Sequence, residues 1–135
     1  MKSERVFPYR KELSGVFGRV DRPRIEVHLK AQTGRWIKVS PYADSGADFT
    51  LFPRSVSKLL GLKLRSGRKS LIGGINGPPL VIYVHTVEMK IGRKEFAAKV
   101  AFANSDQVPY LLGKIDTLEH FEICFEKARV RFIER

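Results

Sequence analysis

The sequence is dominated by short runs in which hydrophobic and polar residues alternate. A period of two is expected of a strand with one buried face, and Ile25, Val27 and Leu29 show it clearly. Glycine-containing turns separate neighbouring runs and predict hairpins. The alternating or strand-like runs cover residues 25–30, 35–42, 49–52, 70–72, 80–91, 96–102, 110–113, 121–125 and 129–133. About nine short strands with frequent turn signals predict an all-β sandwich or barrel.

Two short helices are predicted between these strands. The first has an apolar side made of Val56, Leu59 and Leu60, and Gly61 is suited to the position after its last turn. Residues 114–120 predict the second. The helical content is therefore small and does not change the all-β prediction.

Two segments differ from simple strands. Residues 70–84 have apolar arms around a glycine-rich tip, which predicts a long hairpin with a mobile end. Residues 1–21 mix charges with glycines and lack a sustained period, so they predict an N-terminal arm. We expect one folded domain over residues 22–135.

Composition places the chain among globular proteins. Its 135 residues suit one domain, and 43% hydrophobic residues argue against disorder. No apolar run is long enough to span a membrane, and no apolar signal region follows the charged N-terminus. A single cysteine, Cys124, cannot form an internal disulfide. These features predict a cytoplasmic protein without membrane attachment.

The chain is basic, with 25 Lys and Arg against 14 Asp and Glu, a formal charge of +11. Such a surplus can indicate nucleic-acid binding. However, the cations are spread along the chain, and the densest group, residues 63–69, has little aromatic interleaving. We therefore interpret the charge as solvated surface and do not expect nucleic acid as the partner.

Several common catalytic arrangements are missing from the sequence. His28, His85 and His120 lack the spacing of metal ligands. Ser45 does not lie in a Gly-x-Ser-x-Gly turn, and Cys124 lies in an apolar strand pattern typical of core residues. We expect no metal and no organic cofactor.

Residues 42–50, Tyr-Ala-Asp-Ser-Gly-Ala-Asp-Phe-Thr, carry the strongest chemical signal. A strand delivers Asp44 into a tight turn that glycine permits, and both flanks are apolar. The stretch resembles the Asp-Thr/Ser-Gly-Ala signature of retropepsin-like aspartic proteases. The signature itself covers only a few residues, so the remaining chain has to support it.

Three further segments resemble segments of that family, and along the chain they occur in the order found in the family. Residues 69–77 are similar to the glycine-rich flap of viral retropepsins, Leu111-Leu112-Gly113 to the element beneath the active-site loop, and Arg22-Pro23 to the start of the viral enzymes. The resemblance covers about residues 22–133. It implies a retropepsin-like closed barrel or sandwich with a flap hairpin, acting as a homodimeric endopeptidase on protein or peptide substrates.

The resemblance also implies roles for residues of the Asp44 turn. Asp44 and its symmetry mate would act as general base and acid, because the chain holds one such turn. The Ser45 hydroxyl would lock the two loops together, and Gly46 would let the backbone approach the substrate. Asp48 would bind substrate main chain and pair with an arginine of the other subunit, for which Arg22 is the candidate.

Substrate contacts follow from the same resemblance. The flap residues Gly73, Gly74 and Ile75 would close over an extended peptide. Residues expected to line side-chain pockets are Ala47, Ile75, Pro109 and Leu111. The chain departs from the viral pattern in having Lys114 where those enzymes have arginine, two prolines beside the flap tip, and a longer N-terminal arm.

Two other functions remain open from the sequence. A catalytically silent dimer of this fold would bind extended peptides without cutting them. A basic β-barrel would bind nucleic acid, with affinity that falls steeply with salt and does not depend on Asp44.

Overall fold

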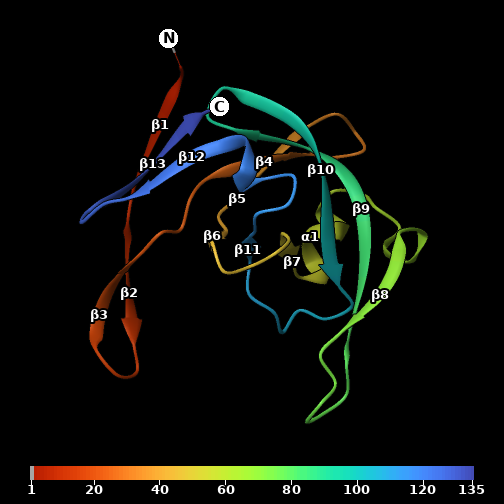
Figure 1. Cartoon of the computed structure of the whole chain (residues 1–135). Helices are drawn as coiled ribbons and strands as arrows, with labels where there is room; N and C mark the ends of the chain where they lie inside the picture. The colour runs from red at the N-terminus through yellow and green to blue at the C-terminus, as the bar shows by residue number, and fades with distance from the viewer. Residues whose placement is uncertain (1) are drawn as a thin grey trace.

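The computed structural model describes residues 2–135 and is built mainly of strands in three sheets (Figure 1). The strands are β1 (Glu4–Pro8), β2 (Arg10–Ser14), β3 (Gly18–Arg22), β4 (Val27–Lys30), β5 (Trp36–Val39), β6 (Tyr42–Ala43), β7 (Leu51–Phe52), β8 (Arg68–Ile72), β9 (Leu80–Ile91), β10 (Lys94–Ala103), β11 (Leu111–Leu112), β12 (Phe121–Phe125) and β13 (Arg129–Glu134). The helices are α1 (Arg54–Leu59) and the short 3-10 turns η1 (Leu64–Ser66) and η2 (Leu118–His120). The all-β prediction is confirmed.

The largest sheet has the order β5-β4-β9-β10-β7-β11-β6, and β8 pairs with β9 outside this path. The long hairpin β9–β10 forms its centre, because β9 pairs with β4 near one end and with β8 near the other. Inward-facing Val87, Met89 and Ile91 are buried, as the alternation predicted. The sheet curls around a core that includes Phe52, Phe102 and other fully buried side chains.

A second sheet joins the two ends of the chain in the order β1-β13-β12. Phe7 of β1 is buried, and its ring lies edge-on to that of Phe132 at 5.4 Å between centroids. Phe121 contacts the same ring at 5.2 Å. Part of the predicted arm, residues 4–8, is thus a strand of the folded protein.

The rest of the arm forms a separate hairpin, β2–β3, which extends away from the body on the same side as the β8–β9 tip (Figure 1). Leu13, Val16 and Phe17 at its end are exposed hydrophobic residues. Because the hairpin buries few side chains, its sequence carries no periodic signal.

One predicted strand and both predicted helices differ in detail from the structure. Residues 35–42 do not form one strand, because the chain leaves the ladder at Ser40 and Pro41 before β6 begins. Leu59 of α1 is 60% exposed, whereas Val56 and Leu60 are buried. The predicted helix over residues 114–120 is reduced to η2, since turns occupy its first half. Among the described residues, no helix has the length and apolar character needed to cross a membrane.

The terminal sheet generates a stability prediction. Replacing Phe7 by Ala removes a side chain that is only 6% exposed, so we expect the free energy of unfolding to fall by about 3 kcal/mol. Denaturant unfolding of both proteins measures the difference. Val6→Ala, on the exposed face of the same strand, serves as the control and should cost far less. Equal effects of the two substitutions would contradict the placement of β1 on β13.

Candidate active site

The Asp44 turn begins where β6 lies beside β11. The two strands are parallel, with Tyr42 opposite Leu111 and Ala43 opposite Leu112. The Asp44 amide then donates a hydrogen bond of 3.0 Å to the Leu112 carbonyl, which continues the ladder by one residue. The backbone of Asp44 is therefore held by the sheet although its side chain lies in a turn.

The turn itself fixes one oxygen of the Asp44 carboxylate. The Gly46 amide donates to Asp44 Oδ1 at 2.9 Å, and the Ala47 amide donates to the Asp44 carbonyl at 3.1 Å. A Cβ at Gly46 would lie 3.3 Å from the same Oδ1, so glycine allows this close approach. Asp44 is half-buried, while Ser45 and Gly46 are exposed. The carboxylate is held in place and remains open to solvent on one side.

A buried polar cluster supports the turn from below. The Thr50 hydroxyl accepts a hydrogen bond of 3.0 Å from the Gly113 amide and lies 3.0 Å from the Thr117 hydroxyl, which donates to the Gly113 carbonyl. Both threonines are fully buried. Neither threonine was among the site residues predicted from the sequence. Thr50 ends the stretch singled out there, but no local pattern marks Thr117.

Gly113 lies against the turn with no space for a side chain. A Cβ at this position would come within 2.3 Å of the Phe49 carbonyl oxygen and 2.8 Å of its nitrogen. Next to it, the Lys114 amide donates to the Ala47 carbonyl at 3.0 Å and the Ile115 amide to the Asp48 carbonyl at 2.9 Å. Residues 44–49 are thus joined to residues 112–115 by main-chain contacts.

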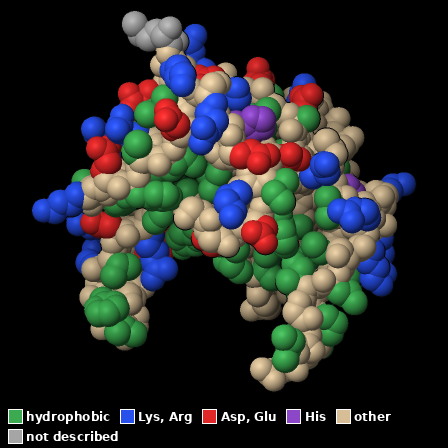
Figure 2. All heavy atoms as spheres, in the orientation of Figure 1, with side chains coloured by type: hydrophobic (Ala, Val, Ile, Leu, Met, Phe, Trp, Pro, Cys, Tyr) green, Lys and Arg blue, Asp and Glu red, His purple; other side chains and the backbone are tan. Residues whose placement is uncertain are grey.

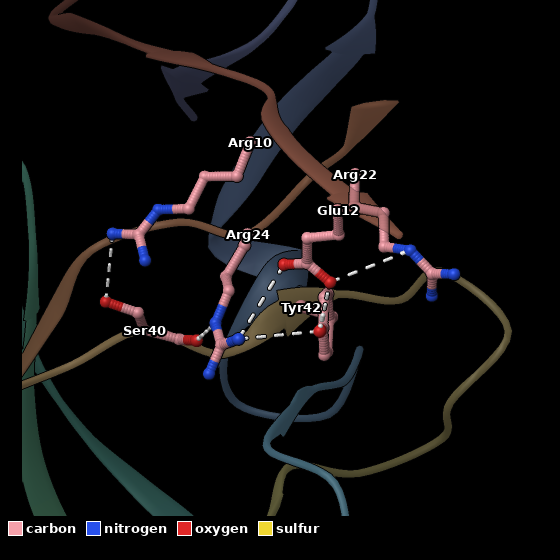
Figure 3. Close-up of polar contacts among 6 residues, drawn as sticks. All are labelled: Arg10, Glu12, Arg22, Arg24, Ser40 and Tyr42. Atoms are coloured by element: carbon pink, nitrogen blue, oxygen red, sulfur yellow. Dashed lines mark hydrogen bonds and ion pairs between the residues drawn. The ribbon is translucent and has the colours of Figure 1, made fainter. Parts of the chain in front are cut away.

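A charged cluster connects the β2–β3 hairpin to the strand that leads into Asp44 (Figure 3). Tyr42 donates to Glu12 Oε1 at 2.6 Å, and Glu12 also faces Arg24 Nη1 and Arg22 Nε at 3.7 Å each. Arg24 Nε donates to the Ser40 carbonyl at 2.6 Å. The hydrogen bond to Glu12, followed by burial, raises the pKa of the Tyr42 phenol above its usual value. Tyr42 therefore remains a neutral donor over the physiological pH range.

The two residues predicted to form a pair between subunits have other partners within this chain. Arg22 faces Glu12, although its Nε is buried without a hydrogen bond. Asp48 has a side chain that is 78% exposed, and its carboxylate lies 3.8 Å from Lys114 Nζ. The pairing between subunits remains a prediction.

The predicted flap is the β8–β9 hairpin, and its tip extends from the body (Figure 1). Gly73 and Gly74 have positive φ angles of 73° and 99°, which glycine adopts without strain. Ile75 is 92% exposed. Figure 2 shows the body hollowed between this tip and the β2–β3 hairpin, with hydrophobic side chains along the hollow.

The remaining predicted residues lie around the turn or at its margin. Ala47 is half-buried within the turn, and Leu111 packs with the smaller hydrophobic cluster of Leu51 and Ile82. Pro109 is exposed in the loop before β11. In the part of the chain that the structure describes, no group of three His, Cys, Asp or Glu side chains could hold a metal ion. The arrangement offers one positioned carboxylate and an extended hairpin with a glycine-containing tip.

Comparisons with known proteins bear on the fold. No protein-family profile and no curated protein matches the sequence. A retropepsin-like aspartic protease from Rickettsia conorii matches the structure with a TM-score of 0.65 and 17% identity, over 99% of this chain and 94% of that one. The EIAV protease in complex with the inhibitor HBY-793 matches with a TM-score of 0.51 and 20% identity, over 75% of this chain and 86% of that one. The chain therefore has the retropepsin-like fold that the resemblance implied.

The close contact at Gly113 generates a prediction. Gly113→Ala forces a methyl group against the Phe49 backbone, which cannot move without breaking the turn, so we expect a loss of about 3 kcal/mol in unfolding free energy. Thermal and denaturant unfolding measure it. Gly77→Ala is the matched control, because a Cβ there meets nothing within 4 Å and the backbone is not in the left-handed region. A Gly113 variant as stable as the Gly77 variant would refute the contact.

Proposed function

We propose that this chain is an aspartic endopeptidase, active as a homodimer in which two Asp44 carboxyls, one from each subunit, share the site. The observation that carries the proposal is the Asp44 turn. Its carboxylate accepts a hydrogen bond from Gly46, its amide is held by Leu112, and its outer side is open to solvent. The retropepsin-like fold supports the same assignment.

The chemistry requires two carboxyl groups. One carboxylate removes a proton from water as the water oxygen attacks the peptide carbonyl carbon, and the other, protonated, donates its proton to the carbonyl oxygen. When the resulting tetrahedral diol collapses, the carboxyl that took the proton from water gives it to the leaving amine and the C–N bond breaks. The other carboxylate takes a proton from a diol hydroxyl as the carbonyl re-forms, which restores the starting pair. Two adjacent carboxyls favour this state because both cannot ionise cheaply at short distance. The chain has only one Asp-Ser-Gly turn, and the Asp48 carboxylate faces Lys114, so we propose that a two-fold axis beside Asp44 supplies the second carboxyl.

The surrounding residues have proposed roles in that dimer. Exposed Ser45 lies next to the axis, where its hydroxyl can hydrogen-bond the opposite loop. Gly46 leaves space for the substrate backbone, and Asp48 is proposed to bind substrate main chain. Arg22 is proposed to pair with the carboxylate of Asp48 in the other subunit.

The β8–β9 hairpin is proposed to close over the peptide. Gly73 and Gly74 give its tip conformational freedom, and closure by Ile75 would exclude water and hold the peptide extended. Ala47, Leu111 and Pro109 are proposed to line pockets for hydrophobic side chains near the cleaved bond. Such pockets select by shape and apolar area.

The first test is cleavage of a denatured protein by the wild type and by Asp44→Asn. The amide cannot act as base or acid, so we expect cleavage to fall about 100-fold or more. Sedimentation analysis of both proteins checks that the dimer is retained. Equal cleavage by both would remove Asp44 from the mechanism. Absence of cleavage in both, with dimers present, would favour the silent peptide-binding dimer.

The shared proton predicts a pH dependence. The rate should be greatest at mildly acidic pH, because both carboxyls are ionised at higher pH and both are protonated at lower pH. Measuring kcat/KM across the range from about pH 3 to about pH 8 tests this shape. A profile that stays flat over this range would contradict a carboxyl pair.

A double-mutant cycle tests the proposed pair between Arg22 and Asp48. If the two interact across the dimer, Arg22→Ala and Asp48→Ala should each weaken dimerisation, and their coupling should be about 1 kcal/mol. Lys114→Ala is the control, because Lys114 is the partner of Asp48 within the chain. Coupling of Asp48 with Lys114 but not with Arg22 would contradict the pair.

A further inference from the structure

A cavity of about 290 Å³ lies between the stem of the β8–β9 hairpin and the loop that follows Asp44. Its apolar surface includes Phe49 from that loop, Ile82 from β9 and Ala101 from β10. Its charged surface consists of Arg68 on β8 and Lys99 on β10, and no carboxylate lines it. The cavity therefore combines an apolar floor with cations alone.

These two cations are not neutralised within the chain. Among the described residues, neither Arg68 nor Lys99 has a carboxylate within salt-bridge distance, although nine such pairs occur elsewhere. Asp116 does approach Lys99, but its Oδ2 accepts from the Lys99 backbone amide at 2.9 Å. Two unpaired cations beside an apolar surface attract a side chain that has apolar methylene groups and an anionic end.

The position of the cavity determines which molecule would enter it. Phe49 follows Asp44 by five residues, and Arg68 lies on the strand whose far end carries the glycine-rich tip. A peptide held in extended form beneath that hairpin directs alternate side chains to the same face. One of those side chains would therefore reach the cavity while the peptide backbone lies near Asp44.

We propose that this cavity is a specificity subsite that selects a glutamate side chain of the substrate. The inference rests on the proposed peptidase function and adds its substrate class. The methylene groups of glutamate would contact Ile82 and Ala101, and its carboxylate would pair with Arg68 and Lys99. The net charge of +11 also attracts acidic segments of a substrate before they bind.

The test uses a peptide library to find cleaved sequences, followed by matched peptides that differ only in Glu or Gln at each position near the cut. We expect the wild type to prefer Glu at one position by about tenfold in kcat/KM, a difference of about 1.4 kcal/mol. In Arg68→Gln combined with Lys99→Gln, the preference should fall to about twofold or less. Arg93→Gln, an exposed cation at the β9–β10 turn, is the control and should retain the full preference.

A charge reversal gives a second measurement. An unfolded variant would lose cleavage altogether, whereas a folded variant with reversed charge should change its preference. Arg68→Glu combined with Lys99→Glu makes the cavity acidic, so the preference at the same position should change from Glu to Lys. A wild type that treats Glu and Gln alike at every position would overturn the proposal, and so would a Glu preference unchanged in the double variant.

Failure of the peptidase assignment can be separated from failure of the subsite. If the wild type cuts no peptide, fluorescence anisotropy of labelled Glu and Gln peptides measures binding directly. Preferential binding of Glu peptides that depends on Arg68 and Lys99 would support the subsite in a non-cleaving dimer. Equal or absent binding of the two peptides would overturn it.

Discussion

The contact between Gly113 and the Phe49 backbone is the constraint on which the site depends. Only glycine lets these two main-chain segments lie this close, with 2.3 Å between an added Cβ and the Phe49 oxygen. This approach brings the Leu112 carbonyl to the Asp44 amide and the Lys114 amide to Ala47. A turn that would otherwise fluctuate as a surface loop is therefore fixed by the sheet, which gives its carboxylate a defined position.

The threonine pair beneath the turn makes this arrangement specific. Buried hydroxyls are costly unless they are paired, and Thr50 and Thr117 satisfy each other as well as Gly113. A shifted register between the two segments would leave these groups unpaired in an apolar core. The buried pair thus disfavours alternatives to the observed turn, while Glu12 and Tyr42 add a second attachment from the β2–β3 hairpin.

The sequence predicted what depends on local periodicity. The inward positions of β9 and β10, the end of α1 at Gly61 and the turn at Asp44 all follow from patterns of a few residues. The pairing of β1 with β13 depends on contacts between segments at opposite ends of the chain. The break before β6 coincides with Pro41, which has no amide to donate to a strand ladder. Thr117 was missed because the partner that gives it a place beneath the turn is Thr50, which is distant in sequence.

The hairpin proposed to close over the peptide carries charge at its stem and none at its tip. The fixed stem of the β8–β9 hairpin carries Arg68 and Lys69, whereas residues 70–84, which include the whole tip, contain no Lys, Arg, Asp or Glu. In the proposed closure over a peptide, a charge-free tip would bury glycine and Ile75 without desolvating an ion, so the closure would have a low electrostatic cost. Arg68 at the stem lines the same cavity as Phe49, which belongs to the anchored turn. Selection by charge and closure over the peptide can therefore be carried by different residues of one hairpin.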